Sequence, residues 1–366
     1  MLVFDGGSTR QCWARCKAAD FKPYLITKGS IGMNIWGIHM SEKVGSSPLV
    51  KNYVGIGWPE LGDLKPIAST REQLKQALLN AYPDIKKGAV AVNAGVLFRF
   101  INEVQLGDII VYPSKFDRMV NIGRVTSDYK FVQNDEYGYP NQRSIAWLAS
   151  FPRSDFSQAA LNEIGAFITL FSVKNYGADF LAKVNLAQAV VKTEDSAFEE
   201  PDDDITTEGL SQQAIQTTED FVIKQLYTKL DGYEFEHFVA HLLECMGYKT
   251  RVSAKSGDGG VDVIAHKDEL GFEPPIVKVQ CKKSTGQNGE QEANQLLGTL
   301  GDGEYALFVN LGSYSRPARL LERNKAKLRL IDGDELVDLV LENYAKLSPK
   351  YRALLPLKQI YVPDLP

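Results

Sequence analysis

Three polar residues in the C-terminal half have the types and spacing that hydrolysis of a phosphodiester requires. Asp262 opens one short apolar run, and Gln280 and Lys282 close a second run that ends 20 residues further along the chain. Both runs are rich in valine and are bounded by glycine or proline, which predicts two adjacent strands. Alternate side chains of a strand share a face, so Gln280 and Lys282 point the same way. If the strands pair, two oxygen ligands for a divalent ion and one cation converge.

The same pattern also fits a surface strand whose polar side chains are merely solvated. The segment just upstream favours the catalytic interpretation. Residues 233–246 carry apolar side chains at the period of an amphipathic helix, and Gly247 is well placed to end that helix. Glu236 lies at the border of the apolar stripe, from where its carboxylate can reach a site on the sheet.

Several blocks of this region resemble the Mrr-like restriction endonuclease domain, over roughly residues 225–346. These blocks are residues 235–240, 246–248, 257–262, 279–283, 307–310 and 330–333. The resemblance implies the PD-(D/E)xK nuclease fold, in which helices flank a mixed sheet. It also accounts for Gln280, because the Mrr branch often has glutamine where other members carry an acidic ligand.

The resemblance implies a role for each polar residue of the two runs. Asp262 and Gln280 bind Mg²⁺ or Mn²⁺, and the backbone carbonyl of Cys281 is a candidate third ligand. Lys282 acts on the attacking water and adds positive charge where the transition state becomes negative. Glu236 supports the site from its helix. The neutral Gln280 removes one negative charge from the metal site, which favours a mechanism with a single metal ion.

The net charge of −5 at first argues against binding of DNA, but its distribution does not. Residues 191–220 contain ten acidic residues and one lysine, so the rest of the chain carries +4. This segment shows no periodicity and predicts an acidic flexible linker within residues 177–222. A plain spacer and an autoinhibitory arm that mimics DNA are both open interpretations.

A basic stretch follows the nuclease motifs and begins at Ser315, which is placed to cap a helix. Four of its side chains are candidates for contact with DNA phosphates: Arg316, Arg319, Arg323 and Lys325. Such contacts supply affinity without reading the base sequence. A solvated helix face is the alternative interpretation.

The N-terminal half contains several short apolar runs separated by glycine and proline, which predict a small β-barrel with peripheral helices. Residues 33–176 resemble the PUA-like and EVE-like modules found beside restriction nucleases. That resemblance implies an aromatic pocket that takes up a base, often a modified one. The candidate rings, each of which can instead be a buried core residue, are Trp36, Trp58, Tyr112, Tyr129 and Trp147.

We therefore predict a two-domain protein of the α+β or α/β class. Residues 1–32 are a leader or a misassigned start and are expected to be disordered. Residues 33–176 form the PUA-like reader, 177–222 the acidic linker, 223–346 the nuclease domain and 347–366 a C-terminal tail. The cysteines suggest no disulfide framework and no run of 18 apolar residues occurs, so we expect a cytoplasmic protein without a membrane span.

The expected activity is that of a type IV-like restriction endonuclease used in antiviral defence. Double-stranded DNA, in modified form, is the expected partner and substrate. We also expect a homodimer, because a two-fold pair of active sites matches the symmetry of duplex DNA. Two alternatives remain at this point: a non-specific nuclease that a nucleotide signal switches on, and a catalytically weak DNA-binding module.

Overall fold

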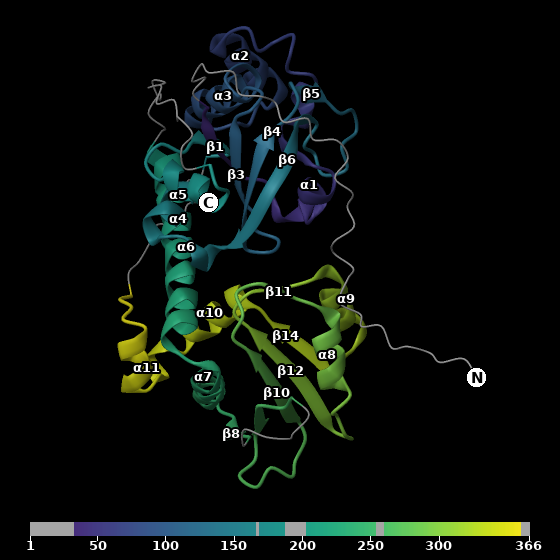
Figure 1. Cartoon of the computed structure of the whole chain (residues 1–366), viewed down its shortest axis with the longest axis vertical. Coiled ribbons are helices and arrows are strands. Elements are labelled where there is room, and N and C mark those ends of the chain that lie inside the picture. The colour runs from purple at the N-terminus through teal and green to yellow at the C-terminus, as the bar shows by residue number, and fades with distance from the viewer. Residues whose placement is uncertain (1–32, 166–167, 187–202, 254–259, 360–366) are drawn as a thin grey trace, which may run out of the picture.

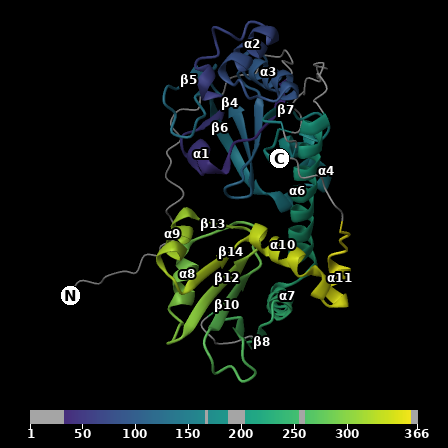
Figure 2. The ribbon, with the colours of Figure 1, turned by 180° about the vertical axis from the view of Figure 1, so that it is seen from behind.

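The computed structural model describes residues 33–165, 168–186, 203–253 and 260–359 (Figure 1). Two sheets with helices packed on their faces lie one above the other, and the long helix α6 (Asp203–Lys229) runs along both (Figures 1 and 2). The predicted mixture of helices and mixed sheets is thus confirmed. The predicted leader at residues 1–32 lies outside the described residues. None of the described helices has both the length and the apolar character needed to cross a bilayer.

The N-terminal sheet has seven strands and curls into half a barrel (Figure 1). Its strands in spatial order are β2 (Tyr53–Ile56), β6 (Asn141–Pro152), β4 (Met119–Val125), β3 (Ile109–Pro113), β1 (Ile35–Ile38) and β7 (Leu170–Ser172), and β5 (Lys130–Phe131) also pairs with β6. The edge strands β2 and β7 do not pair with each other anywhere in the described chain. The structure therefore differs from the predicted barrel, because the curled sheet stays open.

The bend of this sheet has a local cause. The register of β4 against β6 shifts between Ile122 and Gly123, and such a bulge bends a strand. A Cβ atom on Gly123 would lie 2.4 Å from a methyl of Ile145 and 2.8 Å from the ring of Trp147. Only glycine lets the two strands approach this closely, so the curl depends on it.

Helices cover both faces of the N-terminal sheet. The helices α2 (Arg71–Ala81) and α3 (Lys87–Asn102) pack on one face, and α4 (Gln158–Ile164) and α5 (Gly177–Lys183) on the other. The hydroxyl of Thr70 accepts a hydrogen bond from the Gln73 amide at 3.2 Å and thereby caps the start of α2. Each face therefore has its own apolar core.

The C-terminal sheet is mixed, as predicted, and its five strands are in the order β14, β12, β10, β9, β8. These strands are β14 (Leu328–Ile331), β12 (Glu304–Asn310), β10 (Ile276–Lys282), β9 (Val263–His266) and β8 (Lys249–Val252). The predicted pairing of the two polar-tipped strands is confirmed, because Val279 of β10 lies opposite Val263 of β9 in an antiparallel ladder. The strands β10, β12 and β14 run parallel to one another.

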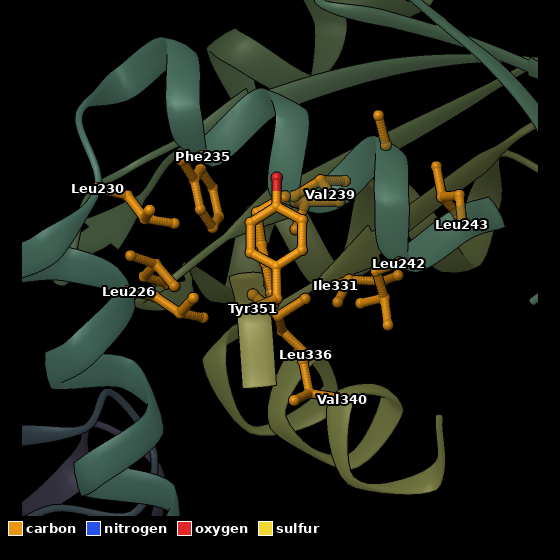
Figure 3. Packing of buried hydrophobic residues seen from close by; sticks show 14 of the residues in the cluster. Leu226, Leu230, Phe235, Val239, Leu242, Leu243, Ile331, Leu336, Val340 and Tyr351 are labelled. Atoms are coloured by element: carbon orange, nitrogen blue, oxygen red, sulfur yellow. The ribbon is translucent and has the colours of Figure 1, made fainter. Parts of the chain in front are cut away.

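Helix α7 (Gly232–Cys245) matches the amphipathic helix expected over residues 233–246. Asp231 caps it in a capping box with Glu234, and Gly247 ends it with φ at +89°, where a side chain would be strained. With α10 (Gly333–Glu342) and α11 (Pro349–Leu354), it covers one face of the sheet (Figure 3). The helices α8 (Glu290–Leu297) and α9 (Arg316–Asn324) cover the other face.

Two predicted segment types are corrected by the structure. Within the expected linker, residues 177–183 form α5 and residues 203–222 belong to α6, so these parts are helical rather than irregular. The expected C-terminal tail contains α11, and its Tyr351 and Leu355 are buried in the core of the C-terminal half. Both segments fold because their apolar residues find partners in tertiary structure, which local periodicity does not show.

The two halves meet at a buried ionic cluster on α6. Asp220 accepts two hydrogen bonds from the guanidinium of Arg153, at 2.7 and 2.5 Å, and lies 3.4 Å from Arg118. Arg118 also pairs with Asp334 of α10, and burial of the Arg118 guanidinium lowers the pKa of Arg118. A second link joins the hydroxyl of Ser313 to the backbone carbonyl of Asp117 at 3.1 Å. The half-barrel is therefore attached to the C-terminal half by direct polar contacts.

Replacing Asp220 with alanine should destabilise the protein. Breaking this buried pair removes the carboxylate that faces the buried guanidinium of Arg153, so we expect a loss of about 3 kcal/mol in the free energy of unfolding. Urea denaturation of the full chain measures this. Glu342, exposed on α10, supplies the control, and Glu342→Ala should leave the midpoint unchanged. Equal midpoints for the Asp220 variant and the wild type would contradict the assignment of this cluster.

Candidate active site

Asp262 is held at the start of β9 by the backbone on both sides. Its amide donates to the Val279 carbonyl at 2.8 Å, and its carbonyl accepts from the Ser253 amide at 2.8 Å. Its side-chain oxygen Oδ2 accepts a 2.6 Å hydrogen bond from the Cys281 amide. Burial raises the pKa of this carboxyl, and the Cys281 bond opposes that shift. Asp262 is thus a fixed, half-buried carboxylate directly beside β10.

Gln280 lies on the neighbouring strand with its amide oxygen buried. Among the described residues, Oε1 of Gln280 has no hydrogen-bond partner. Such an acceptor costs about 1–3 kcal/mol when it is left unpaired, so its retention needs a reason. The side chain packs over Gly260, where an added Cβ would lie 2.9 Å from Nε2 of Gln280. Gly260 has φ at +90°, so the backbone there leaves the space that the amide occupies.

Lys282 ends β10 and points to the face of the sheet that carries α8. Its ammonium group Nζ lies 2.6 Å from Oε1 of Glu292 on that helix, and 42% of the side chain is exposed. Gln280 and Lys282 alternate with Cys281, whose side chain packs on the opposite face beside α7. The predicted common face of Gln280 and Lys282 fits this arrangement.

Glu236 approaches from α7, on the face opposite to Lys282. Together with Asp262 it raises the pKa of the Cys281 thiol, although burial is the larger cause. Its charge is therefore felt at β10, beside Asp262. The predicted support role of Glu236 remains a prediction.

The residues at this position fit a divalent ion of the magnesium type. The carboxylate of Asp262 and the unpartnered oxygen of Gln280 are hard oxygen donors, which Mg²⁺ and Mn²⁺ prefer. No group of three or more His, Cys, Asp or Glu side chains that could hold a metal occurs in the described part of the chain. A site that uses an amide and backbone oxygens does not need such a group. The predicted contribution of the Cys281 carbonyl stays a prediction.

The four predicted phosphate contacts differ in their surroundings. Arg316, Arg323 and Lys325 are exposed on and just after α9. Arg319 is partly buried and pairs with three carboxylates, those of Glu322, Asp332 and Glu335. Its charge is already neutralised, so Arg319 serves to hold α9 to α10 rather than to contact phosphate. The other three stay candidates.

Two of the predicted pocket aromatics are core residues instead. Trp36 is 5% exposed and its indole N–H donates to Asp108 at 2.9 Å, while Tyr112 is 1% exposed. Side chains so deeply buried cannot stack on a base without unfolding of the core. The sequence could not separate these cases, because core and pocket aromatics have the same local pattern.

The other three aromatics pack at the edge of the same core and are partly exposed, namely Trp58, Tyr129 and Trp147. The hydroxyl of Tyr129 bonds to Asn141 at 2.6 Å and to Asp63 at 2.8 Å. The indole of Trp147 donates to the Pro48 carbonyl at 3.0 Å. Their use in a base pocket remains a prediction.

Sequence analysis missed Glu292, the ion-pair partner of Lys282. The available signal was its place at the third position of a helix that follows Gly289, where an acid stabilises the helix start. That signal indicates a capping role and says nothing of Lys282.

Comparison with known proteins adds to this geometry. Residues 227–340 match a protein family described as restriction endonuclease, and residues 33–174 match one described as a domain of unknown function. A relative, the type IV methyl-directed restriction enzyme EcoKMrr of Escherichia coli (strain K12), is 26% identical over 215 residues. The matched part covers 56% of this chain and 67% of that protein.

Two solved structures also show similarity to the chain. The MspJI restriction endonuclease in complex with a 27-mer oligonucleotide is 19% identical with a TM-score of 0.31, over 68% of this chain and 63% of that one. The DNA modification-dependent restriction endonuclease AspBHI is 13% identical with a TM-score of 0.29, over 83% and 78% of the two chains.

Proposed function

Because residues 227–340 form a restriction endonuclease domain of the Mrr type, we propose that the chain hydrolyses DNA at Asp262, Gln280 and Lys282 with the help of Mg²⁺ or Mn²⁺. The observation that carries the proposal is the buried, unpartnered oxygen of Gln280, which lies on the strand beside the fixed carboxylate of Asp262. Asp262 and Gln280 would hold the ion, which when bound polarises the phosphate and acidifies a water.

The residues of the chain have separate tasks in this proposal. The Cys281 amide holds one oxygen of Asp262, so the carboxylate keeps its orientation when DNA arrives. Gln280 adds an oxygen without a charge, which limits repulsion between the site and the DNA backbone. Lys282 places a cation where negative charge develops on the phosphate in the transition state. The exposed Arg316, Arg323 and Lys325 bind phosphates outside the reacting group.

In the same proposal the half-barrel directs the nuclease to modified DNA. Support comes from the relative in Escherichia coli, whose name describes it as methyl-directed. The partly exposed rings of Trp58, Tyr129 and Trp147 are the remaining candidates for stacking on a base, and a PUA-like or EVE-like module would use them so.

Cleavage of a panel of duplexes tests whether base modification directs the nuclease to its substrate. With the full chain and Mg²⁺, we expect methylated or hydroxymethylated duplexes to be cut faster than an unmodified duplex of the same sequence. A fragment that starts at residue 203 keeps all of α6 and should cut every duplex slowly and at one rate. A start at residue 221, inside α6, would remove Asp220 and is the wrong boundary. If the fragment keeps the full preference, the half-barrel is not the reader.

A second candidate function is a nuclease that a small nucleotide signal switches on. The observation that favours it is a cavity of about 510 Å³ that both halves line. Its polar lining includes Lys115 and Arg153 from the N-terminal half, Glu219 from α6 and Asp332 from the nuclease half. Cleavage of unmodified DNA that appears only after addition of small molecules from infected cells would favour this candidate.

The proposed enzyme acts as a homodimer through its nuclease half. The turn between β9 and β10 exposes Leu270 by 76% and Phe272 by 81%. A groove of about 890 Å³, lined mainly by apolar residues, begins at Pro274 and Pro275 next to this turn. Glu273 on the turn and Lys327 on the groove are both exposed and of opposite charge. A two-fold pair can place each turn in the groove of its partner.

The double variant Leu270→Asp/Phe272→Asp should be monomeric, because two charges cannot enter an apolar groove without a large desolvation cost. Light scattering at several protein concentrations, with and without duplex DNA, measures the mass. Leu320→Asp, at an exposed leucine on α9, is the matched control and should remain dimeric. A monomeric wild type, or a dimeric double variant, contradicts this interface.

A further inference from the structure

We infer that Glu292 is a positioning residue that holds the ammonium group of Lys282 in its working place. The inference rests on the proposed function of Lys282. The contact is direct: Nζ of Lys282 lies 2.6 Å from Oε1 of Glu292, which is ten positions further along the chain. Among the described residues, Glu292 is the one carboxylate that forms an ion pair with Lys282.

The carboxylate of Glu292 is itself fixed. It belongs to the third residue of α8, whose cap Gly289 has no side chain to satisfy the first amides of the helix. The hydrogen bond from Lys282 is the largest cause that lowers the pKa of Glu292, and the backbone at Gly289 lowers it further. A carboxylate at the positive end of a helix is further stabilised by the helix dipole. Glu292 thus joins the helix start to Lys282.

The segment between the two residues is also held in place. Within it, β11 (Gln287–Asn288) pairs with β13 (Ser313–Tyr314), and Thr285 bonds through its hydroxyl to Ser154 of the N-terminal half at 3.2 Å. A Cβ on Gly312 would lie 2.0 Å from the Gly286 carbonyl, so the two backbones touch. The start of α8, and with it Glu292, therefore has a defined place relative to the end of β10.

The Lys282–Glu292 pair adds little to the stability of the fold, but it strongly restricts the position of the Lys282 side chain. With 42% and 32% of the two side chains exposed, water screens much of the attraction, and exposed pairs contribute little to folding. A free lysine side chain, however, samples many rotamers. Catalysis depends on groups placed to within a fraction of an ångström, so loss of one anchor slows the chemical step rather than DNA binding.

Single-turnover cleavage by the full chain tests the inference. Glu292→Ala should lower the rate by roughly 10- to 100-fold while the Kd for DNA stays unchanged. Glu292→Gln keeps one oxygen that can accept from Lys282 but carries no charge, so it should recover part of that loss. Glu290→Ala changes an exposed acid in the same first turn and should cleave at the wild-type rate. A wild-type rate for Glu292→Ala, or a loss caused equally by Glu290→Ala, overturns the inference.

A double-mutant cycle separates positioning from a purely structural role. If Glu292 acts through Lys282, Glu292→Ala should cause little further loss when it is added to Lys282→Ala. Losses that multiply in the double variant, or a weaker Kd for DNA, contradict the inference. The outcome is distinct from failure of the proposed function. In that case Lys282→Ala itself would cleave normally, whereas here Lys282→Ala keeps only a low, measurable residual rate and only the effect of Glu292 is in question.

Discussion

Replacing Asp262 with alanine is expected to lower the rate of Mg²⁺-dependent cleavage by roughly 1,000-fold, the loss typical when a group that stabilises transition-state charge is removed. The backbone holds the carboxylate of Asp262 directly beside Gln280, through its bond to the Cys281 amide. Binding of DNA should remain, because the exposed cations that we propose as phosphate contacts lie on and just after α9. Single-turnover cleavage and a filter-binding assay measure the two quantities.

Two further variants make this result specific. Asp262→Asn keeps an oxygen that accepts from the Cys281 amide but has no charge, so it should fold like the wild type and still fail to cleave. Asp302→Ala removes an exposed acid in the same domain and should cleave normally. Thermal unfolding of each variant shows whether the fold is intact. Cleavage by Asp262→Asn at the wild-type rate would remove Asp262 from the proposed site.

Gln280→Leu is expected to abolish cleavage without any loss of stability. The amide oxygen of Gln280 is buried and has no partner among the described residues, so leucine removes an unsatisfied acceptor. The free energy of unfolding should stay the same or rise by about 1 kcal/mol, whereas the metal loses a ligand. Urea denaturation, metal titration by calorimetry and cleavage are the three measurements. Gln295→Leu, at an exposed glutamine of α8, is the control.

Gln280→Glu strengthens the proposed metal ligand at the same position, whereas Gln280→Leu removes it. It introduces a second carboxylate beside Asp262, so calorimetry should show tighter binding of Mg²⁺ or Mn²⁺, and cleavage should be retained or altered rather than lost. Normal cleavage by Gln280→Leu, or equal metal affinity in both variants and the wild type, shows that Gln280 is not a ligand.

Local patterns in the sequence were sufficient for the elements that carry the proposed site. The valine-rich runs predicted the strands that pair through Val263 and Val279, and apolar periodicity predicted α7 with its end at Gly247. These signals work because strand alternation and helix period depend on residues within a few positions of one another. The resemblance to the nuclease family rests on the same short blocks and was confirmed by the match over residues 227–340.

The apolar residues of α6 form no single stripe, and this is why the sequence predicted a linker there. Side chains such as Val222 and Leu226 enter the core of the nuclease half, while Asp220 faces Arg153 of the other half. A helix that serves two partners on different sides has no simple amphipathic pattern. Its acidic residues predicted a solvated segment, but arginines from the half-barrel neutralise part of their charge.

The sequence by itself determined which residues have chemistry suited to the reaction, namely Asp262, Gln280 and Lys282, and which strands present them. Tertiary structure alone decided how these and other polar groups are used. It buried Trp36 and Tyr112 in a core, and it bound Lys282 to Glu292. The ion pair that neutralises the charge of Arg319 also forms only in the folded structure. The reason is that burial and ion pairing depend on contacts between elements that are distant along the chain, whereas a sequence pattern records only neighbours.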